Sequence, residues 1–111
     1  MDLIRGTTPT ILITVKTEVD LTQVTAIWVY ISQQNKVKVD KQLDDVAFNY
    51  EDRQIIANLS QEDTLGLRTG EALFQIRMLL ENGTALATIA SKVKVIEVYK
   101  GGVITEEVNN G

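Results

Sequence analysis

Apolar and polar residues alternate over most of this chain, which is the pattern of half-buried β-strands. The clearest example is the segment 74–81. Its even-numbered residues are the apolar Phe74, Ile76, Met78 and Leu80, and the polar residues Gln75, Arg77 and Glu81 have odd numbers. Asn82-Gly83 follows, and this dipeptide predicts a two-residue type I′ turn because both of its residues accept positive φ. The run 85–98, with Lys92 and Lys94 against Val93, Val95 and Val98, predicts the partner strand of a long hairpin.

The segment 24–33 is apolar on both faces at its centre, which is typical of a central strand. Trp28 and Tyr30 share one of these faces. Their position in mid-strand favours a core site for Trp28 between two sheets. The alternative is a surface anchor for a partner or a sugar, and an exposed Trp28–Tyr30 face would then be a partner site.

Four shorter strands are predicted by the same alternation, at 11–16, 36–43, 46–50 and 54–59, with polar turns between them. Ser60 and Asp63 have the spacing of a capping box, and Gly66 follows closely. This pattern predicts one helical turn at 60–65 that crosses between two sheets. About seven strands in all favour an all-β, antiparallel sandwich in one domain, residues 1–100, with a small barrel as the alternative. Residues 101–111 form a flexible tail or assembly arm after a Gly101-Gly102 hinge.

Composition removes several classes of function. The 111 residues include no cysteine and no histidine, so thiolate chemistry and the commonest general base are absent. The net charge of −4 and the scattered lysines argue against nucleic-acid binding. No apolar run is long enough to span a bilayer, and the N-terminus does not have the pattern of a signal peptide.

The remaining candidate chemistry is weak. Carboxylates occur as sequence neighbours in turns, at 44–45, 51–52, 62–63 and 106–107, without the spacing of a calcium loop. We expect them to be solvated turn residues, with a weak cation site between loops as the alternative. Ser91 and Lys92 are adjacent but would point to opposite faces of a strand. The sequence therefore predicts no catalytic residue, no metal ligand and no cofactor, and hence no enzyme.

Several short motifs occur together in order along nearly the whole chain: Arg5-Gly6-Thr7-Thr8-Pro9-Thr10, Ile31-Ser32-Gln33, Leu59-Ser60-Gln61-Glu62-Asp63-Thr64-Leu65, Ile76-Arg77-Met78-Leu79, Asn82-Gly83-Thr84-Ala85-Leu86-Ala87 and Lys100-Gly101-Gly102-Val103-Ile104. In these motifs the chain resembles a group of small, mostly uncharacterised proteins of phages and prophages of Gram-positive bacteria. The expected sandwich is similar to the immunoglobulin-like domains of phage tail and baseplate proteins. The resemblance implies a virion component in the tail, baseplate or neck, or a protein made alongside one, and supplies no catalytic residues.

The two ends of the chain supply the candidate interaction residues. Val103, Ile104 and Val108 lie beyond the glycine hinge, and Leu3 and Ile4 precede Gly6. An arm of this kind could add a strand to the open sheet edge of a neighbouring subunit. The alternative for residues 101–111 is a frayed terminus.

We therefore expect a structural protein that associates with itself or with other phage structural proteins, located in the virion or in the host cytoplasm before assembly. Nucleic acid, membranes and small-molecule substrates are not expected as partners. The alternative is a carbohydrate-binding module for host cell-wall sugars, although only 5% of the residues are aromatic.

Overall fold

A computed structural model describes residues 1–106 of the chain. The strands are β1 (Asp2–Ile4), β2 (Thr10–Thr14), β3 (Val24–Gln33), β4 (Lys36–Lys41), β5 (Val46–Asn49), β6 (Gln54–Asn58), β7 (Gly70–Leu80), β8 (Ala85–Ala87) and β9 (Ser91–Ile96). The helical elements are short: the 3-10 turns η1 (Leu21–Gln23) and η2 (Leu43–Asp45), and the helix α1 (Gln61–Leu65). No helix in residues 1–106 is long and apolar enough to cross a membrane.

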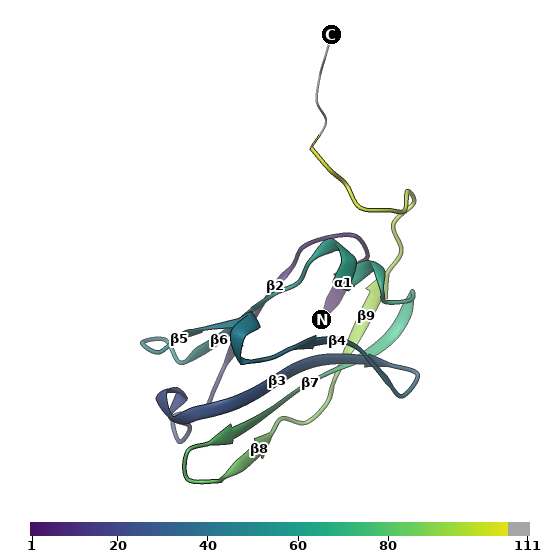
Figure 1. Ribbon diagram of the computed structural model, residues 1–111. Coiled ribbons are helices and arrows are strands. Elements are labelled where there is room, and N and C mark those ends of the chain that lie inside the picture. The colour runs from purple at the N-terminus through teal and green to yellow at the C-terminus, as the bar shows by residue number, and fades with distance from the viewer. Residues whose placement is uncertain (107–111) are drawn as a thin grey trace.

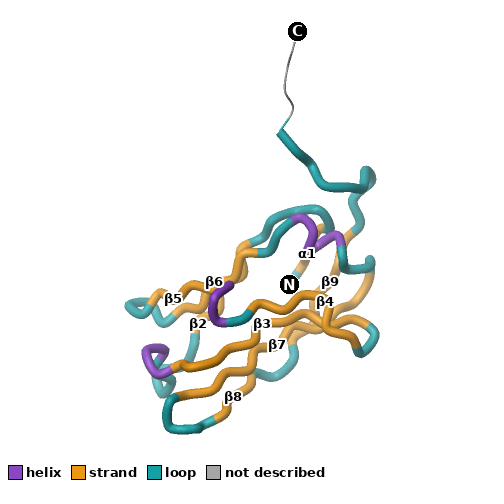
Figure 2. Tube along the Cα trace, viewed as in Figure 1, coloured by secondary structure: helices purple, strands orange, loops and turns teal. Residues whose placement is uncertain are grey.

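The strands form two sheets that face each other as an open sandwich (Figures 1 and 2). The larger sheet has the order β1-β9-β7-β3-β4, with β8 paired to β7, and the smaller sheet has the order β2-β6-β5. All pairs are antiparallel except β1 with β9. The all-β prediction is confirmed, and two separate sheets agree with a sandwich and not with a barrel.

The core lies between the two sheets, because each strand directs its alternate, apolar side chains toward the other sheet. The larger sheet contributes mainly β3, β7 and β9, and the smaller sheet contributes β2 and β6. Side chains buried there include Ile27, Val29, Ile31, Phe74, Ile76, Val93 and Val95 from the first, and Ile11, Ile55 and Ala57 from the second. Burial alternates along β7 as the sequence predicts, and it places the even-numbered residues from Ala72 to Leu80 inside.

The turn at Asn82-Gly83 differs from the prediction. Only Gly83 has positive φ there (85°), and its amide donates to the Leu80 carbonyl at 2.9 Å. The loop therefore has three residues and a glycine bulge, so the type I′ prediction is wrong at this site. The two-residue turn with both φ positive lies instead between β3 and β4, at Gln34 (52°) and Asn35 (63°).

The single strand expected over 85–98 is divided into β8 and β9. Both pair with β7, but the register shifts between them: Gln75 and Ile76 lie opposite the three residues 88–90. The extra residue reverses the parity, so that Leu86 faces the core from β8 while Val93 and Val95 face it from β9. This bulge and the pairing of β1 raise the strand number in residues 1–106 above the expected seven.

The predicted capping box is present at α1. The Ser60 side chain accepts a hydrogen bond from the Asp63 amide at 3.0 Å, and the Asp63 carboxylate accepts one from the Ser60 amide at 2.8 Å. The helix ends at Leu65 after one turn and a half, and it connects the smaller sheet to the larger sheet, as Figure 1 shows. It lies at the end of the sandwich from which the C-terminal segment leaves.

Candidate functional site

One long side of the sandwich leaves the core partly open, and we call the opening the β2–β8 groove. It has a volume of about 500 Å³. Its walls come from the inward side chains of both sheets and from the bulge: Ile13, Thr14, Val15, Lys16, Val19, Ile76, Met78, Leu86, Ala87, Thr88 and Ile89. Lys16 is the one ionisable residue among these lining side chains. The groove is therefore an apolar surface and has no acid–base pair for catalysis.

The bulge after β8 shapes the rim of this groove. Thr88 fixes the bulge, because its amide donates to the Ile76 carbonyl at 2.9 Å and its hydroxyl accepts from the Ile76 amide at 3.0 Å. Ile89 then projects with 91% of its surface exposed. A fully exposed isoleucine beside an apolar groove extends the apolar surface that a partner could cover.

The outward face of the larger sheet carries the aromatic residues that the sequence singled out. Trp28 is 43% exposed, so the expected core position is wrong, and Ile27, Val29 and Ile31 fill the core from the opposite face. The Arg77 guanidinium lies 5.1 Å from the Trp28 ring centroid, on the strand directly opposite. The Tyr30 hydroxyl donates a hydrogen bond to Gln75 beside them.

A shallow hollow of about 320 Å³ lies next to Trp28 on this face. Its lining includes the small side chains of Ala26 and Ala85, and also Leu79, which is 41% exposed. An aromatic ring beside a shallow hollow could hold a flat ligand or the side chain of a partner protein.

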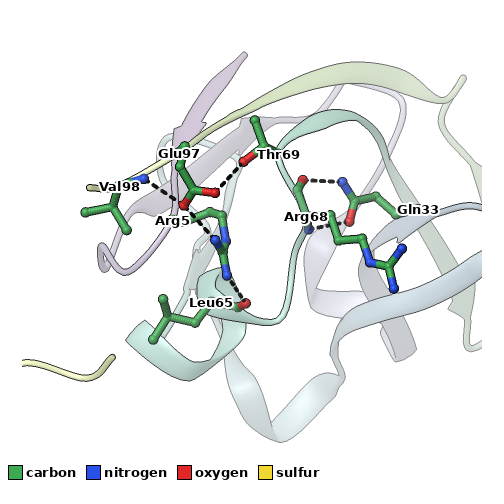
Figure 3. Close-up of polar contacts among 7 residues, drawn as sticks. All are labelled: Arg5, Gln33, Leu65, Arg68, Thr69, Glu97 and Val98. Atoms are coloured by element: carbon green, nitrogen blue, oxygen red, sulfur yellow. Dashed lines mark hydrogen bonds and ion pairs between the residues drawn. The ribbon is translucent and has the colours of Figure 1, made fainter. Parts of the chain in front are cut away.

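A polar cluster joins the two ends of the described fold, as Figure 3 shows. Arg5 pairs with Glu97 at 2.6 Å and donates to the Leu65 carbonyl at 3.0 Å. Hydrogen bonds from the Val98 amide and the Thr69 hydroxyl, together with Arg5, lower the pKa of Glu97 below its usual value. These contacts tie the chain after β1 to α1 and to the exit of β9, so the cluster has a structural role.

The neighbouring Gln33–Arg68 contact is also structural (Figure 3). The Gln33 side chain is buried, accepts a hydrogen bond from the Arg68 amide at 2.8 Å and donates one to the Arg68 carbonyl at 2.6 Å. One amide side chain thus satisfies both backbone groups of a residue in the connection between α1 and β7.

Among the described residues the carboxylate pairs do not converge. Asp45 and Asp63 each accept from a backbone amide in a capping box, and Asp63 also pairs with Lys41 at 2.7 Å. Within residues 1–106 no three acidic side chains are grouped closely enough to hold a metal ion. The carboxylates of Asp45 in η2 and Asp63 in α1 therefore stabilise the first turns of these helical elements.

The candidate residues at the two ends have different surroundings. Leu3 is 2% exposed, because β1 pairs with β9 in the same molecule, whereas Ile4 is 47% exposed. Val103 and Ile104 are 46% and 78% exposed in the segment that leaves the body of the fold (Figure 1). Val108 lies outside the described residues.

The C-terminal segment is hydrogen-bonded to α1 at Ile104. The Gln61 side chain donates to the Ile104 carbonyl at 2.9 Å and accepts from the Ile104 amide at 2.6 Å. From its burial, Leu3 is a core residue. The other candidate interaction residues within the described part of the chain, Ile4, Val103 and Ile104, are accessible.

The chain matches no protein-family model, and a search of the curated proteins also finds no match.

Proposed function

We propose that this chain is a non-enzymatic structural protein that acts through protein–protein contacts in a phage or prophage assembly. Its sandwich would then be of the immunoglobulin-like kind found in tails and baseplates. The observation that carries this proposal is the β2–β8 groove, an open apolar side of the core with Ile89 exposed on its rim. An apolar groove of this size favours a protein partner, because covering it removes apolar surface from water.

The side-chain chemistry supports a contact function over a catalytic one. The strongest polar interactions described above are all used to fix turns and strand ends, at Arg5, Gln33 and Asp63. Neither the groove nor the hollow beside Trp28 contains a carboxylate among its lining residues. These surfaces offer shape and apolar area, which are the elements of a protein interface.

The test is incorporation into particles. We expect a tagged chain, expressed in the cell that produces the assembly, to purify with tail or baseplate particles at a fixed ratio. Ile89→Asp places a charge on the groove rim without touching the core and should lower incorporation at least tenfold. Val37→Asp is the matched control, since Val37 is an exposed apolar residue of β4, far from the groove in sequence.

Absence of the wild-type chain from purified particles would overturn the assembly proposal. Incorporation of Ile89→Asp at the wild-type level would show that the groove is not the contact surface.

The exposed Trp28 supports a second candidate function, a carbohydrate-binding module for cell-wall sugars. A sugar ring could stack on the indole, with the Arg77 guanidinium as a hydrogen-bond donor beside it. Purified cell-wall polysaccharide should then protect Trp28 fluorescence from quenching by acrylamide, and Trp28→Ala should abolish binding. Tyr50→Ala is the control, because Tyr50 is an exposed aromatic residue beyond the smaller sheet. Unchanged quenching at saturating polysaccharide would exclude this candidate.

A further inference from the structure

The free edge of β2 differs from the other sheet edges of the described fold. β2 pairs with β6 on one side, and no other strand in residues 1–106 pairs with its second side. All five of its residues are uncharged. The other edge strands are either charged or shorter: β4 contains Lys36, Lys38, Asp40 and Lys41, β1 begins at Asp2, and β5 and β8 have four and three residues. Charges and short length prevent edge pairing, so β2 is the edge left without this protection.

The sequence of β2 is symmetric about its centre. It reads Thr10-Ile11-Leu12-Ile13-Thr14, so Leu12 is the midpoint of a palindrome. If two copies of β2 lie antiparallel about a two-fold axis at Leu12, each residue faces its equivalent type. Thr10 then lies opposite the partner's Thr14, and Leu12 lies opposite the partner's Leu12. Threonine and aliphatic pairs of this kind stabilise antiparallel strands.

The backbone of β2 presents its free groups at the positions that this pairing needs. The Val15 amide donates to the Arg53 carbonyl at 2.9 Å, and the Pro9 carbonyl accepts from the Leu59 amide at 3.0 Å. With the register of β2 and β6, these two bonds place the odd-numbered residues in hydrogen-bonded pairs with β6. The amides and carbonyls of Thr10, Leu12 and Thr14 therefore point to the free edge. A two-fold axis at Leu12 pairs these same even-numbered residues.

The side chains of β2 agree with a second strand beside it. Leu12 is 58% exposed on the outward face, where the partner's Leu12 would cover it. Ile11 and Ile13 face inward, and Ile13 also lines the β2–β8 groove, which a second copy of β2 would extend. Lys16 would lie opposite the partner's Thr8, so no like charges meet across the strands.

We propose that a second copy of this chain pairs with β2 through an antiparallel, two-fold contact centred on Leu12, which joins two three-stranded sheets into one six-stranded sheet. The inference deepens the proposed function, on which it rests, by naming the partner and the edge. The contact is isologous, because the same residues act on both sides, and it therefore closes as a dimer.

The first test measures the mass of the purified chain by sedimentation equilibrium over a concentration series. We expect a monomer–dimer equilibrium for the wild type. Leu12→Lys and Leu12→Glu should each weaken dimerisation at least tenfold, because two like charges then meet on the two-fold axis. An equimolar mixture of the two variants should dimerise again, since opposite charges now face each other.

Val37→Lys is the matched control, because Val37 is 57% exposed on the edge strand β4, and it should dimerise like the wild type. A wild-type chain that stays monomeric at about 1 mM overturns the proposal. A dimer that persists unchanged in Leu12→Lys, or a mixture that fails to recover although both variants are folded by circular dichroism, also overturns it.

The second test reads the register directly, in a chain that has no native cysteine. Residues that face each other in a hydrogen-bonded pair have Cα atoms about 5.5 Å apart, within the reach of a disulfide. Leu12→Cys should therefore oxidise to a covalent dimer. Thr10→Cys should not, since the two copies of residue 10 would lie roughly 13 Å apart along the strands. Equal oxidation of the two variants would contradict the two-fold register.

Both tests use the purified chain and require no particle. Loss of the dimer with normal incorporation into particles would leave the assembly proposal intact. A dimer without incorporation would leave the β2 pairing intact and remove the assembly role.

Discussion

At the scale of single residues, buried polar side chains hold the connections between strands. Gln33 has the same parity in β3 as the core residues Ile27, Val29 and Ile31, yet it is polar. Its burial is favourable because both ends of the amide are hydrogen-bonded to the backbone of Arg68. The sequence does not predict that position 33 faces inward, because 24–33 is apolar on both faces and Trp28, on the other face, is the residue expected in the core. It also does not indicate what Gln33 would bind, since Arg68 is distant in sequence.

Gln33→Ala should therefore destabilise the fold. It leaves the amide and carbonyl of Arg68 without the partners that Gln33 supplies, and we expect a loss of about 2 kcal/mol in the free energy of unfolding. Urea denaturation followed by circular dichroism measures this loss. Gln23→Ala, at an exposed glutamine of η1, is the control and should change stability by less than about 0.5 kcal/mol. A cost as small as that of the control would show that the Arg68 backbone is satisfied in another way.

Asp63 gives the fold a pH dependence. Burial alone would raise the pKa of this carboxyl, but hydrogen bonds from Lys41 and from the Ser60 amide hold the pKa below its ordinary value of 3.8. A carboxyl with a lowered folded pKa stabilises the fold above its unfolded pKa, and this contribution is lost as pH falls through the folded pKa.

Asp63→Asn should consequently cost about 1 kcal/mol at pH 7, and the difference from wild type should shrink as the pH is lowered from 4 to roughly 2. Urea denaturation at several pH values measures the two curves. Asp44→Asn removes one exposed carboxylate of η2 and controls for the change in net charge. A difference that stays constant down to pH 2 would contradict the role assigned to the ionised Asp63.

At the scale of elements, the sequence predicts the strands better than the turns and bulges that connect them. The strands β6 and β7 follow from alternation, and β3 follows from a stretch that is apolar on both faces. The helix α1 follows from Ser60 and Asp63. The sequence pattern could have indicated the bulge at 88–90, because the residues that face inward have even numbers at Leu86 and odd numbers at Val93. No sequence pattern indicated the exposure of Trp28, because an apolar stretch on both faces of a strand does not show which face another sheet will cover.

The turn after β7 shows the same limit, since Asn-Gly is compatible with two hairpin geometries and the flanking register selects one. In the observed turn Gly83→Ala should cost about 1 kcal/mol of unfolding free energy. A Cβ at Gly83 would meet nothing within 4 Å, so the cost arises from the positive φ alone. Gly101→Ala, at a glycine with equally open space, should be neutral. Thermal unfolding compares the two, and equal melting temperatures would contradict the assigned turn.

At the scale of the whole molecule, the two ends of the chain contribute unequally to stability. Residues 101–106 are exposed, and hydrogen bonds between Gln61 and Ile104 join them to α1. Residues 2–4, in contrast, form a strand of the larger sheet and bury Leu3. The sequence treats both ends alike, as short apolar segments beside a glycine, because parallel pairing with a distant strand has no local signal.

Deletion of residues 101–111 should therefore change the free energy of unfolding by less than about 0.5 kcal/mol. Deletion of residues 1–4 should cost about 3 kcal/mol or more, because it removes a core leucine and uncovers β9. Chemical denaturation of both truncated proteins measures the contrast. If the first deletion cost as much as the second, the C-terminal segment would have to be counted as part of the folded domain.

The parallel pair of β1 and β9 also limits when the larger sheet can be completed. In the chain, residues 2–4 precede the other strands of the described fold, whereas their partners at 94–96 follow them. Until those partners are available, Leu3 has no strand to pack against, and the larger sheet cannot be completed. Such distant pairing slows folding. Folding of the larger sheet therefore ends late, because the pairing of β1 with β9 must wait until residues 94–96 have been synthesised.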